Sequence, residues 1–141
     1  LDRRAESSSG LEIPAASLTD VVQQYCGGCH NDTRLRGDLT LADFDVERTV
    51  EWAETAEKMI IKLRAGMMPA PGAPRPSADT LLALVETLET LIDEAAAEEA
   101  KAKAEQRLEE GGDISEEEAK ALTHAILYSR AQITAKRRKR G

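Results

Sequence analysis

Residues 25–32 read Tyr-Cys-Gly-Gly-Cys-His-Asn-Asp, and they contain both cysteines and one of the two histidines of the 141-residue chain. Cys26 and Cys29 are separated by two glycines, and His30 follows directly. Two cysteines cannot form the disulfide framework that stabilises many small domains. Aromatic residues make up only 3% of the chain, so few large side chains are available for a core. A small domain of this composition usually needs a metal or a cofactor to complete its interior.

The Cys-x-x-Cys-His spacing is the attachment signature of c-type haem. In this interpretation Cys26 and Cys29 form thioethers to the two haem vinyl groups, and His30 is an axial ligand of the iron. A structural zinc site generally needs four ligands, and the sequence adds only the remote His124. A thioredoxin-like redox pair should follow a strand of a βαβ unit, whereas the pattern here is helical. A coincidental pair of buried cysteines is the third alternative.

The segment Gly66-Met67-Met68-Pro69 offers the second ligand that a histidine-bound haem iron usually needs. Methionine is the ligand that electron-transfer cytochromes use opposite histidine. Met68, directly before the proline, is the expected ligand, with Met67 as the alternate. A loop methionine taken alone is more often core filler, but a position 38 residues after His30 of this motif favours ligation.

Helical patterning dominates the first part of the chain. Residues 1–14 are polar and serine-rich and predict a leader or tether. Apolar spacing predicts a helix that begins near Ser17 or Thr19, and a second over about residues 46–63. Four of the five prolines lie in residues 66–76, which no helix can cross.

The second half of the chain predicts longer helices. Ser77 is expected to cap a helix with an apolar stripe, and residues 93–110 are almost entirely strong helix formers. Gly111-Gly112 should break that helix. Ser115 and Glu118 have the spacing of a capping box for a last helix. Its stripe of Leu122, Ile126, Ser129 and Ile133 is suited to packing on the preceding domain or on another protein.

Residues 25–32, together with residues 62–72 (Lys-Leu-Arg-Ala-Gly-Met-Met-Pro-Ala-Pro-Gly), resemble class I c-type cytochromes. The resemblance extends in particular to the cytochrome c-like domain of large planctomycete-type surface or periplasmic proteins, and it covers about residues 15–95. It implies an all-α domain with crossed terminal helices around one covalent haem c. Cys26 and Cys29 would be the thioether anchors, and His30 and Met68 the axial ligands. Residues 96–141 depart from these relatives, because only a helical tail follows the domain.

These features predict an electron-transfer protein and not an enzyme. The expected role is to carry single electrons between membrane-associated redox complexes of a respiratory or photosynthetic chain, free or as a fixed subunit. The alternatives are a haem enzyme or sensor domain with a displaceable sixth ligand, and a structural scaffold that the haem only stabilises. Haem attachment implies the periplasm or the outer face of the bacterial inner membrane. Because Leu1 is not methionine, an N-terminal signal or anchor is expected to precede it.

Charge is distributed unevenly along the chain. The formal charge is −7, and the five basic residues at 136–140 leave −12 on residues 1–135. Blocks of like charge at a terminus often mark interaction tails. We therefore expect the basic end to dock on anionic lipid or an acidic protein surface, with a solvated end as the alternative and nucleic acid not expected. The docking residues are Lys136, Arg137, Arg138, Lys139 and Arg140.

Other side chains have candidate roles beside a haem. Trp52, the only tryptophan, is expected to pack in the core, with a haem contact as the alternative. His124 is interpreted as a surface or packing residue. Four arginines are candidate partners of the haem propionates, with solvated surface charge as the default for each: Arg34, Arg36, Arg64 and Arg75.

Overall fold

The computed structural model describes residues 12–140, apart from the side chains of residues 139 and 140. Within this range the chain is all-α, as predicted, and contains no strand. The elements are α1 (Ala15–Tyr25), η1 (Arg36–Asp38), η2 (Val46–Trp52), α2 (Ala53–Arg64), α3 (Ala78–Glu110) and α4 (Glu116–Arg140), where η marks a 3-10 helix. Most of the predicted leader, residues 1–11, lies outside the described residues.

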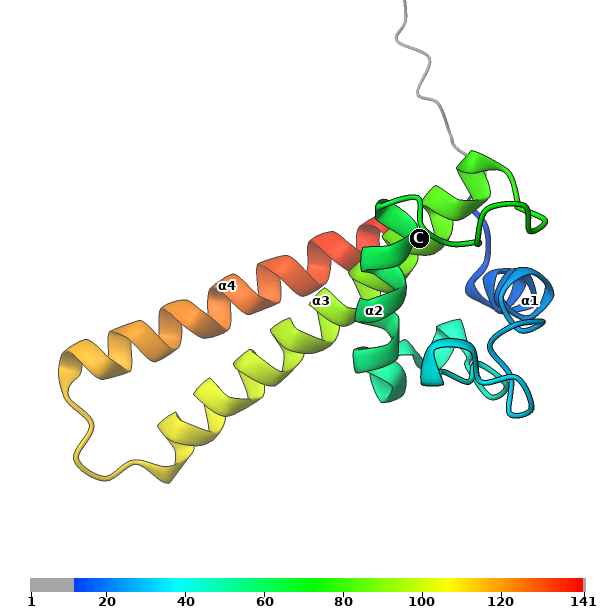
Figure 1. Cartoon of the computed structure of the whole chain (residues 1–141). Helices are drawn as coiled ribbons and strands as arrows, with labels where there is room; N and C mark the ends of the chain where they lie inside the picture. Colours follow the sequence, from blue (N-terminus) through cyan, green and yellow to red (C-terminus); the bar gives the residue numbers. More distant parts are fainter. Residues whose placement is uncertain (1–11, 141) are drawn as a thin grey trace, which may run out of the picture.

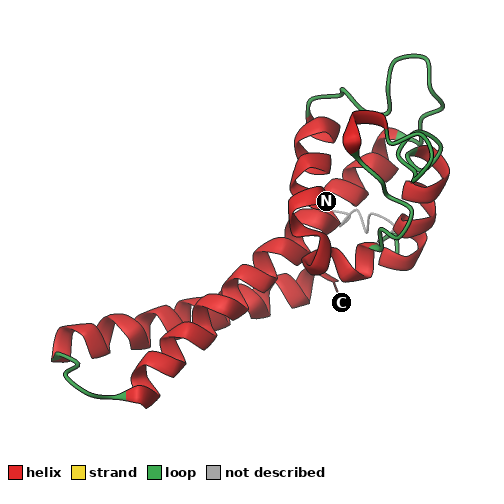
Figure 2. Cartoon of the chain, turned by 60° about the horizontal axis from the view of Figure 1, so that its bottom comes forward, coloured by secondary structure: helices red, strands yellow, loops and turns green. Residues whose placement is uncertain are grey.

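The molecule consists of a head and a long arm (Figure 1). The head, residues 12–92, contains α1, α2, both 3-10 helices and the first part of α3. The arm, residues 93–140, is formed by the rest of α3 and by α4, which pack antiparallel. Figure 2 shows the long loops gathered in the head, whereas the arm has one loop at its far end. α3 passes through the predicted domain boundary at residue 95 without a break.

Large apolar side chains form the core of the head. They come from α1, the segment before α2, α2 itself and α3, so the core joins the three α-helices of the head and η2. Phe44 is the largest fully buried side chain, and Trp52 meets it edge-on with ring centroids 6.1 Å apart. The other buried members of the cluster are Leu18, Val22, Leu41, Val46, Ala56, Met59, Leu84 and Leu88.

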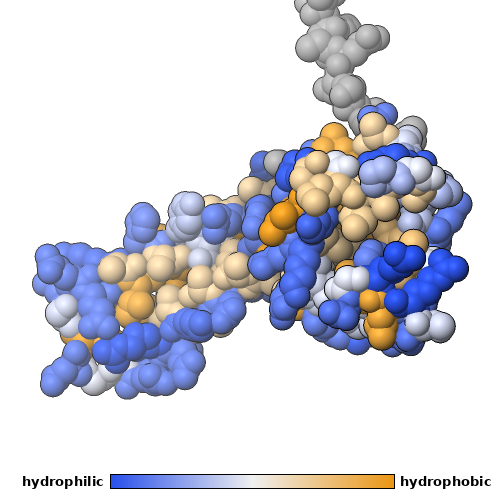
Figure 3. Space-filling view, viewed as in Figure 1, coloured by the Kyte–Doolittle hydropathy of each residue, from blue (hydrophilic) through white to orange (hydrophobic). Residues whose placement is uncertain are grey.

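The arm buries smaller side chains in a regular pattern. Ala97 and Ala104 of α3 are buried, as are Ile126, Ser129 and Ile133 of α4. Spacings of three, four and seven residues are those of the heptad repeat, in which one seam of each helix faces the other. The arm is therefore an antiparallel two-helix coiled coil. In Figure 3 its apolar residues lie between hydrophilic edges.

Two of the helices begin where the sequence predicts, and one does not. Ser77 Oγ accepts a hydrogen bond from Thr80 N (3.2 Å), and Ser115 Oγ accepts one from Glu118 N (3.1 Å), which confirms both caps. α1, however, begins at Ala15 after Pro14, so the predicted start at Ser17 or Thr19 is wrong. The Thr19 hydroxyl instead accepts a hydrogen bond from Val46 N (2.9 Å) and ties α1 to η2.

The second predicted helix is divided into two parts. Residues 46–52 form the 3-10 helix η2, with a non-helical Arg48 (φ −105°, ψ 26°), and α2 follows from Ala53. No helix among the described residues has the length and apolar character needed to cross a membrane.

Candidate functional site

The two cysteines lie in a tight turn at the carboxyl end of α1. Val22 O accepts hydrogen bonds from Cys26 N (2.9 Å) and Gly27 N (3.0 Å), which close the helix. Cys26 O then accepts from Cys29 N (3.2 Å) and His30 N (3.0 Å), so the motif folds back on itself. A Cβ at Gly27 would lie 2.7 Å from Gln23 O, and therefore only glycine fits there without a backbone shift.

The two thiols differ in their surroundings. Both cysteines are free, but Cys29 is exposed whereas Cys26 is half-buried and packs against the core of the head. Burial raises the pKa of the Cys26 thiol, and the neighbouring Cys29 raises it further. A dithiol oxidoreductase needs a thiolate with a lowered pKa, which such enzymes obtain at helix amino termini or beside cations. The position of Cys26 at a helix carboxyl end and its raised pKa both argue against that alternative.

His30 is held by a backbone oxygen. Its Nδ1 lies 2.7 Å from the carbonyl oxygen of Arg36, and because a carbonyl can only accept, Nδ1 carries the proton. In the neutral ring Nε2 is then left with the lone pair that binds a metal. Leu35 adopts a left-handed conformation (φ 41°) at the start of η1, and the following residue presents its carbonyl to the ring. Leu41 N donates to His30 O (2.8 Å) and fixes the backbone at the same residue.

Asn31 fastens the turn from the other side. Its Nδ2 donates to Gly27 O (2.9 Å) and Gly28 O (3.2 Å), and its Oδ1 accepts from Arg34 N (2.9 Å) and Thr33 N (3.1 Å). The Cys-x-x-Cys-His motif does not indicate this role for Asn31. The available signal was the tendency of an asparagine after a turn to bond its neighbouring backbone groups.

The methionine segment forms the loop between α2 and α3. Gly66 (φ 67°) ends α2, and Met67 N donates to Lys62 O (3.0 Å). The Met67 side chain is 53% exposed, and its Sδ lies 3.9 Å from Lys62 Nζ. Met68 is half-buried, so it is the methionine turned toward the protein. This loop and the cysteine turn both belong to the head, at the opposite end of the molecule from the α3–α4 turn (Figure 1).

Arg75 braces the methionine loop. Its Nη1 donates to Pro69 O (2.6 Å) and its Nη2 approaches Met68 O (3.4 Å). Arg34 Nη1 likewise donates to a backbone oxygen, that of Gly28 (3.2 Å). Two candidate propionate partners are therefore engaged with the two loops of the site, and we assign them the role of loop supports.

The remaining candidates lie elsewhere. Arg64 forms a two-pronged ion pair with Glu89 of α3 (2.7 and 2.6 Å), and Trp52 packs on Phe44. His124 is exposed on α4, in the arm. Within residues 12–138 no group of three or more Cys, His, Asp and Glu side chains is arranged to hold a metal ion.

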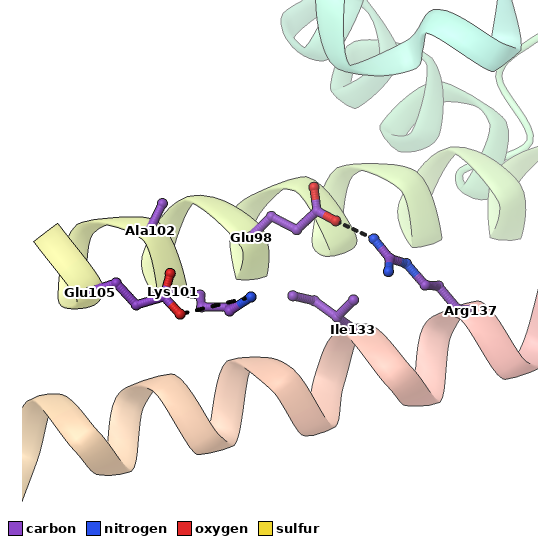
Figure 4. Close-up of a pocket in the computed structure, with 6 residues that line it drawn as sticks. All are labelled: Glu98, Lys101, Ala102, Glu105, Ile133 and Arg137. Carbon is purple, nitrogen blue, oxygen red and sulfur yellow. Dashed lines mark hydrogen bonds and ion pairs between the residues drawn. The ribbon is translucent and has the colours of Figure 1, made fainter.

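Part of the basic end binds within the molecule. Lys136 pairs with Asp93, and Arg137 pairs with Glu94 (3.0 Å) and Glu98 (2.6 Å) of α3. Figure 4 shows the Arg137–Glu98 pair beside a shallow cavity of about 230 Å³ between α3 and α4. The cavity is lined by Glu98, Lys101, Ala102, Glu105, Ile133 and Arg137, and it lies in the arm, not beside the cysteine turn. Two of the five predicted docking residues thus hold α4 against α3.

Comparison of the chain with models of protein families, with curated proteins and with solved structures gives no match.

Proposed function

We propose that this protein is a monohaem c-type cytochrome that carries single electrons and is not itself an enzyme. The observation that supports it most is the hydrogen bond of His30 Nδ1 to Arg36 O, within a Cys-x-x-Cys-His turn. It leaves Nε2 available for a metal and fixes the plane of the ring. The haem, when bound, supplies a one-electron redox couple.

The donor set of the turn fits a covalently attached haem. Two free thiols, Cys26 and Cys29, flank two glycines in a turn whose backbone is bonded at both ends. Asn31 and Arg34 hold the carbonyl of Gly28, so the turn is kept in one shape. We infer that the two cysteines anchor the haem as thioethers and that His30 is one axial ligand.

Met68 is the proposed ligand opposite His30. It is the less exposed of the two adjacent methionines, and the loop that carries it is braced by Arg75. A thioether ligand favours electron transfer and raises the potential relative to a second histidine. With both axial positions filled by protein, the site would pass electrons without binding a substrate.

The proposed setting is the periplasm or the outer face of the bacterial inner membrane. There the protein would exchange electrons with redox complexes of a respiratory or photosynthetic chain. Of the five basic residues proposed to dock on lipid or protein, Lys136 and Arg137 pair with α3, whereas Arg138 makes no ion pair with another residue whose side chain the structure describes. The arm would make the cytochrome a fixed subunit of a larger assembly.

Covalent haem attachment tests the proposal. The full chain, secreted together with a cytochrome c maturation system, should retain its haem after denaturation and acidic solvent extraction. Cys29→Ser should lose one thioether, while His124→Ala, on the exposed face of the arm, should keep the wild-type spectrum. Complete release of haem from the wild-type chain would contradict the proposal.

Axial ligation is tested by a matched pair of variants. Met68→Ala should lower the reduction potential and let the reduced protein bind carbon monoxide, whereas Met67→Ala should change neither. The opposite pattern would assign ligation to Met67. Carbon monoxide binding by the reduced wild-type protein at neutral pH would instead favour a haem enzyme or sensor with a displaceable ligand.

A further inference from the structure

α4 carries a second stripe of side chains on the side turned away from α3. This outer stripe has the same alternating spacings of three and four residues as the inner seam of the arm, and all its members are exposed. Tyr128 at its centre is 60% exposed, and the adjoining Leu127 is 59% exposed. The members are Ala121, His124, Tyr128, Ala131 and Ala135. A second heptad stripe without acidic or lysine and arginine side chains is suited to packing against another helix.

Opposite charges mark the two ends of the outer stripe. The same heptad positions continue to Glu117 in the acidic first turn of α4 and to Arg138 in its basic last turns. Neither side chain makes an ion pair with another described residue, whereas the adjacent Arg137 is paired with α3. Glu117 and Arg138 are therefore available to a partner with the complementary arrangement.

A second copy of this chain has that arrangement. If two α4 helices pack antiparallel about Tyr128, Glu117 of each copy faces Arg138 of the other, and Ala121 faces Ala135. His124 then meets the small Ala131, and the two Tyr128 rings meet at the centre. A parallel pair would instead set acidic turns against acidic turns and basic against basic, which is unfavourable.

We propose that the protein forms an antiparallel homodimer through the outer stripe of α4. The interface is self-complementary, as a two-fold dimer requires. Alanines at three of the five positions permit the close helix approach of about 8–10 Å that such packing needs. α4 has 25 residues, so the two heads lie at opposite ends of a pair of helices about 40 Å long. The inference does not depend on haem binding.

The mass of the full chain in solution, measured by light scattering after size exclusion, tests the dimer. The wild-type chain should be dimeric and should dissociate more readily as salt is raised, because the terminal charge pairs are exposed. Tyr128→Glu should be monomeric with unchanged helix content. Ala100→Glu, at an exposed alanine of α3, is the matched control and should remain dimeric. A wild-type chain that stays monomeric at high concentration, even one that binds a different protein through this stripe, would overturn the proposal.

Charge reversal and cross-linking test the antiparallel register. Glu117→Lys should weaken self-association several-fold, and adding Arg138→Glu should restore it. On oxidation Tyr128→Cys should link the two copies through residue 128, as shown by peptide mapping. Ala121→Cys should not link to itself, but should link to Ala135→Cys when the two variants are mixed. Self-linking of Ala121→Cys would indicate a parallel pair and overturn the proposed register.

Discussion

The head and the arm are both built from helices, but different interactions hold them together. The head buries leucine, valine and phenylalanine side chains from four segments of the chain. The arm buries alanine, isoleucine and serine in one seam, and five ion pairs between described side chains join its two helices. Apolar burial contributes far more free energy than exposed ion pairs do. We infer that apolar area stabilises the head, while charge mainly sets the register of the arm.

The two regions also differ in how they use irregular backbone. The arm has one short loop, between Glu110 and Glu116, and that loop serves to reverse the chain. In the head, long segments before and after α2 are fixed by side chains that bond backbone oxygens, such as Gln23 to Leu41 and Arg75 to Pro69. The cysteine turn and the methionine loop both belong to these segments. In the head, therefore, polar side chains fix the backbone of the two loops that form the candidate site.

The largest effect is expected in the core of the head. Leu88→Ala removes a fully buried side chain of α3 and should lower the free energy of unfolding by about 2–5 kcal/mol. Chemical denaturation followed by circular dichroism measures the loss. Leu82→Ala on the same helix, where the side chain is 49% exposed, should cost much less. Equal losses in the two variants would contradict the assigned core.

A smaller and more local effect is expected in the arm. Ile133→Ala removes a buried side chain beside a cavity and should cost about 2 kcal/mol, the low end for such changes. Hydrogen exchange should quicken in α4 while the amides of α1 keep their protection, because the arm opens without the head. Leu127→Ala, on the exposed side of α4, is the control. Faster exchange in α1 would show that head and arm unfold as one unit.

Removal of one ion-paired side chain should loosen the packing of α4 against α3 near that side chain. Arg137→Gln removes the guanidinium contacts to Glu94 and Glu98 of α3 and should speed hydrogen exchange at the carboxyl end of α4. Arg138→Gln, one residue further on, should leave that exchange unchanged in the monomer. Identical behaviour of the two variants would assign no specific role to the Arg137 contacts.

The smallest effect concerns pH and the contact between α2 and α3. The hydrogen bond from Arg64 lowers the pKa of Glu89 below its ordinary value. A lowered carboxyl pKa contributes stability that is present above the ordinary value of 4.5 and is lost as pH falls through the lowered one. The stability difference between wild type and Glu89→Gln should therefore shrink on acidification. A difference that stays constant with pH would show that the pair contributes nothing.

Much of the fold follows from local sequence, because the caps and stripes of α3 and α4 act over a few residues. Ser77 and Ser115 cap their helices as predicted, and Gly111 ends α3. The start of α1 was not predictable in this way, because Thr19 serves a contact with Val46, 27 residues away, and not a cap. Residues 46–52 likewise look helical by periodicity, but they pack as a 3-10 helix against α1 and α3.

The proposed ligands of the candidate site follow from the sequence, whereas the residues that support them do not. Cys26, Cys29, His30 and Met68 are indicated by motif and spacing, which are visible in sequence. The carbonyl of Arg36 at the His30 ring, and the bonds of Asn31 and Arg75 to nearby loops, depend on backbone geometry that no short motif specifies. For the same reason Lys136 and Arg137 could be recognised as basic, but not as partners of acidic residues more than 35 positions earlier.

The continuity of α3 has a mechanical consequence. Its 33 residues extend over about 50 Å, and the half in the arm is braced by α4. A flexible tether would let a head sample many positions around its attachment point and would set only an effective concentration. Here the head is attached to a rigid pair of helices, so a partner that binds the arm also fixes the orientation of the cysteine turn. If the protein transfers electrons as proposed, a redox partner would have to be aligned with the cysteine turn. The length of α3 would then set the distance between the head and whatever binds the far end of the arm.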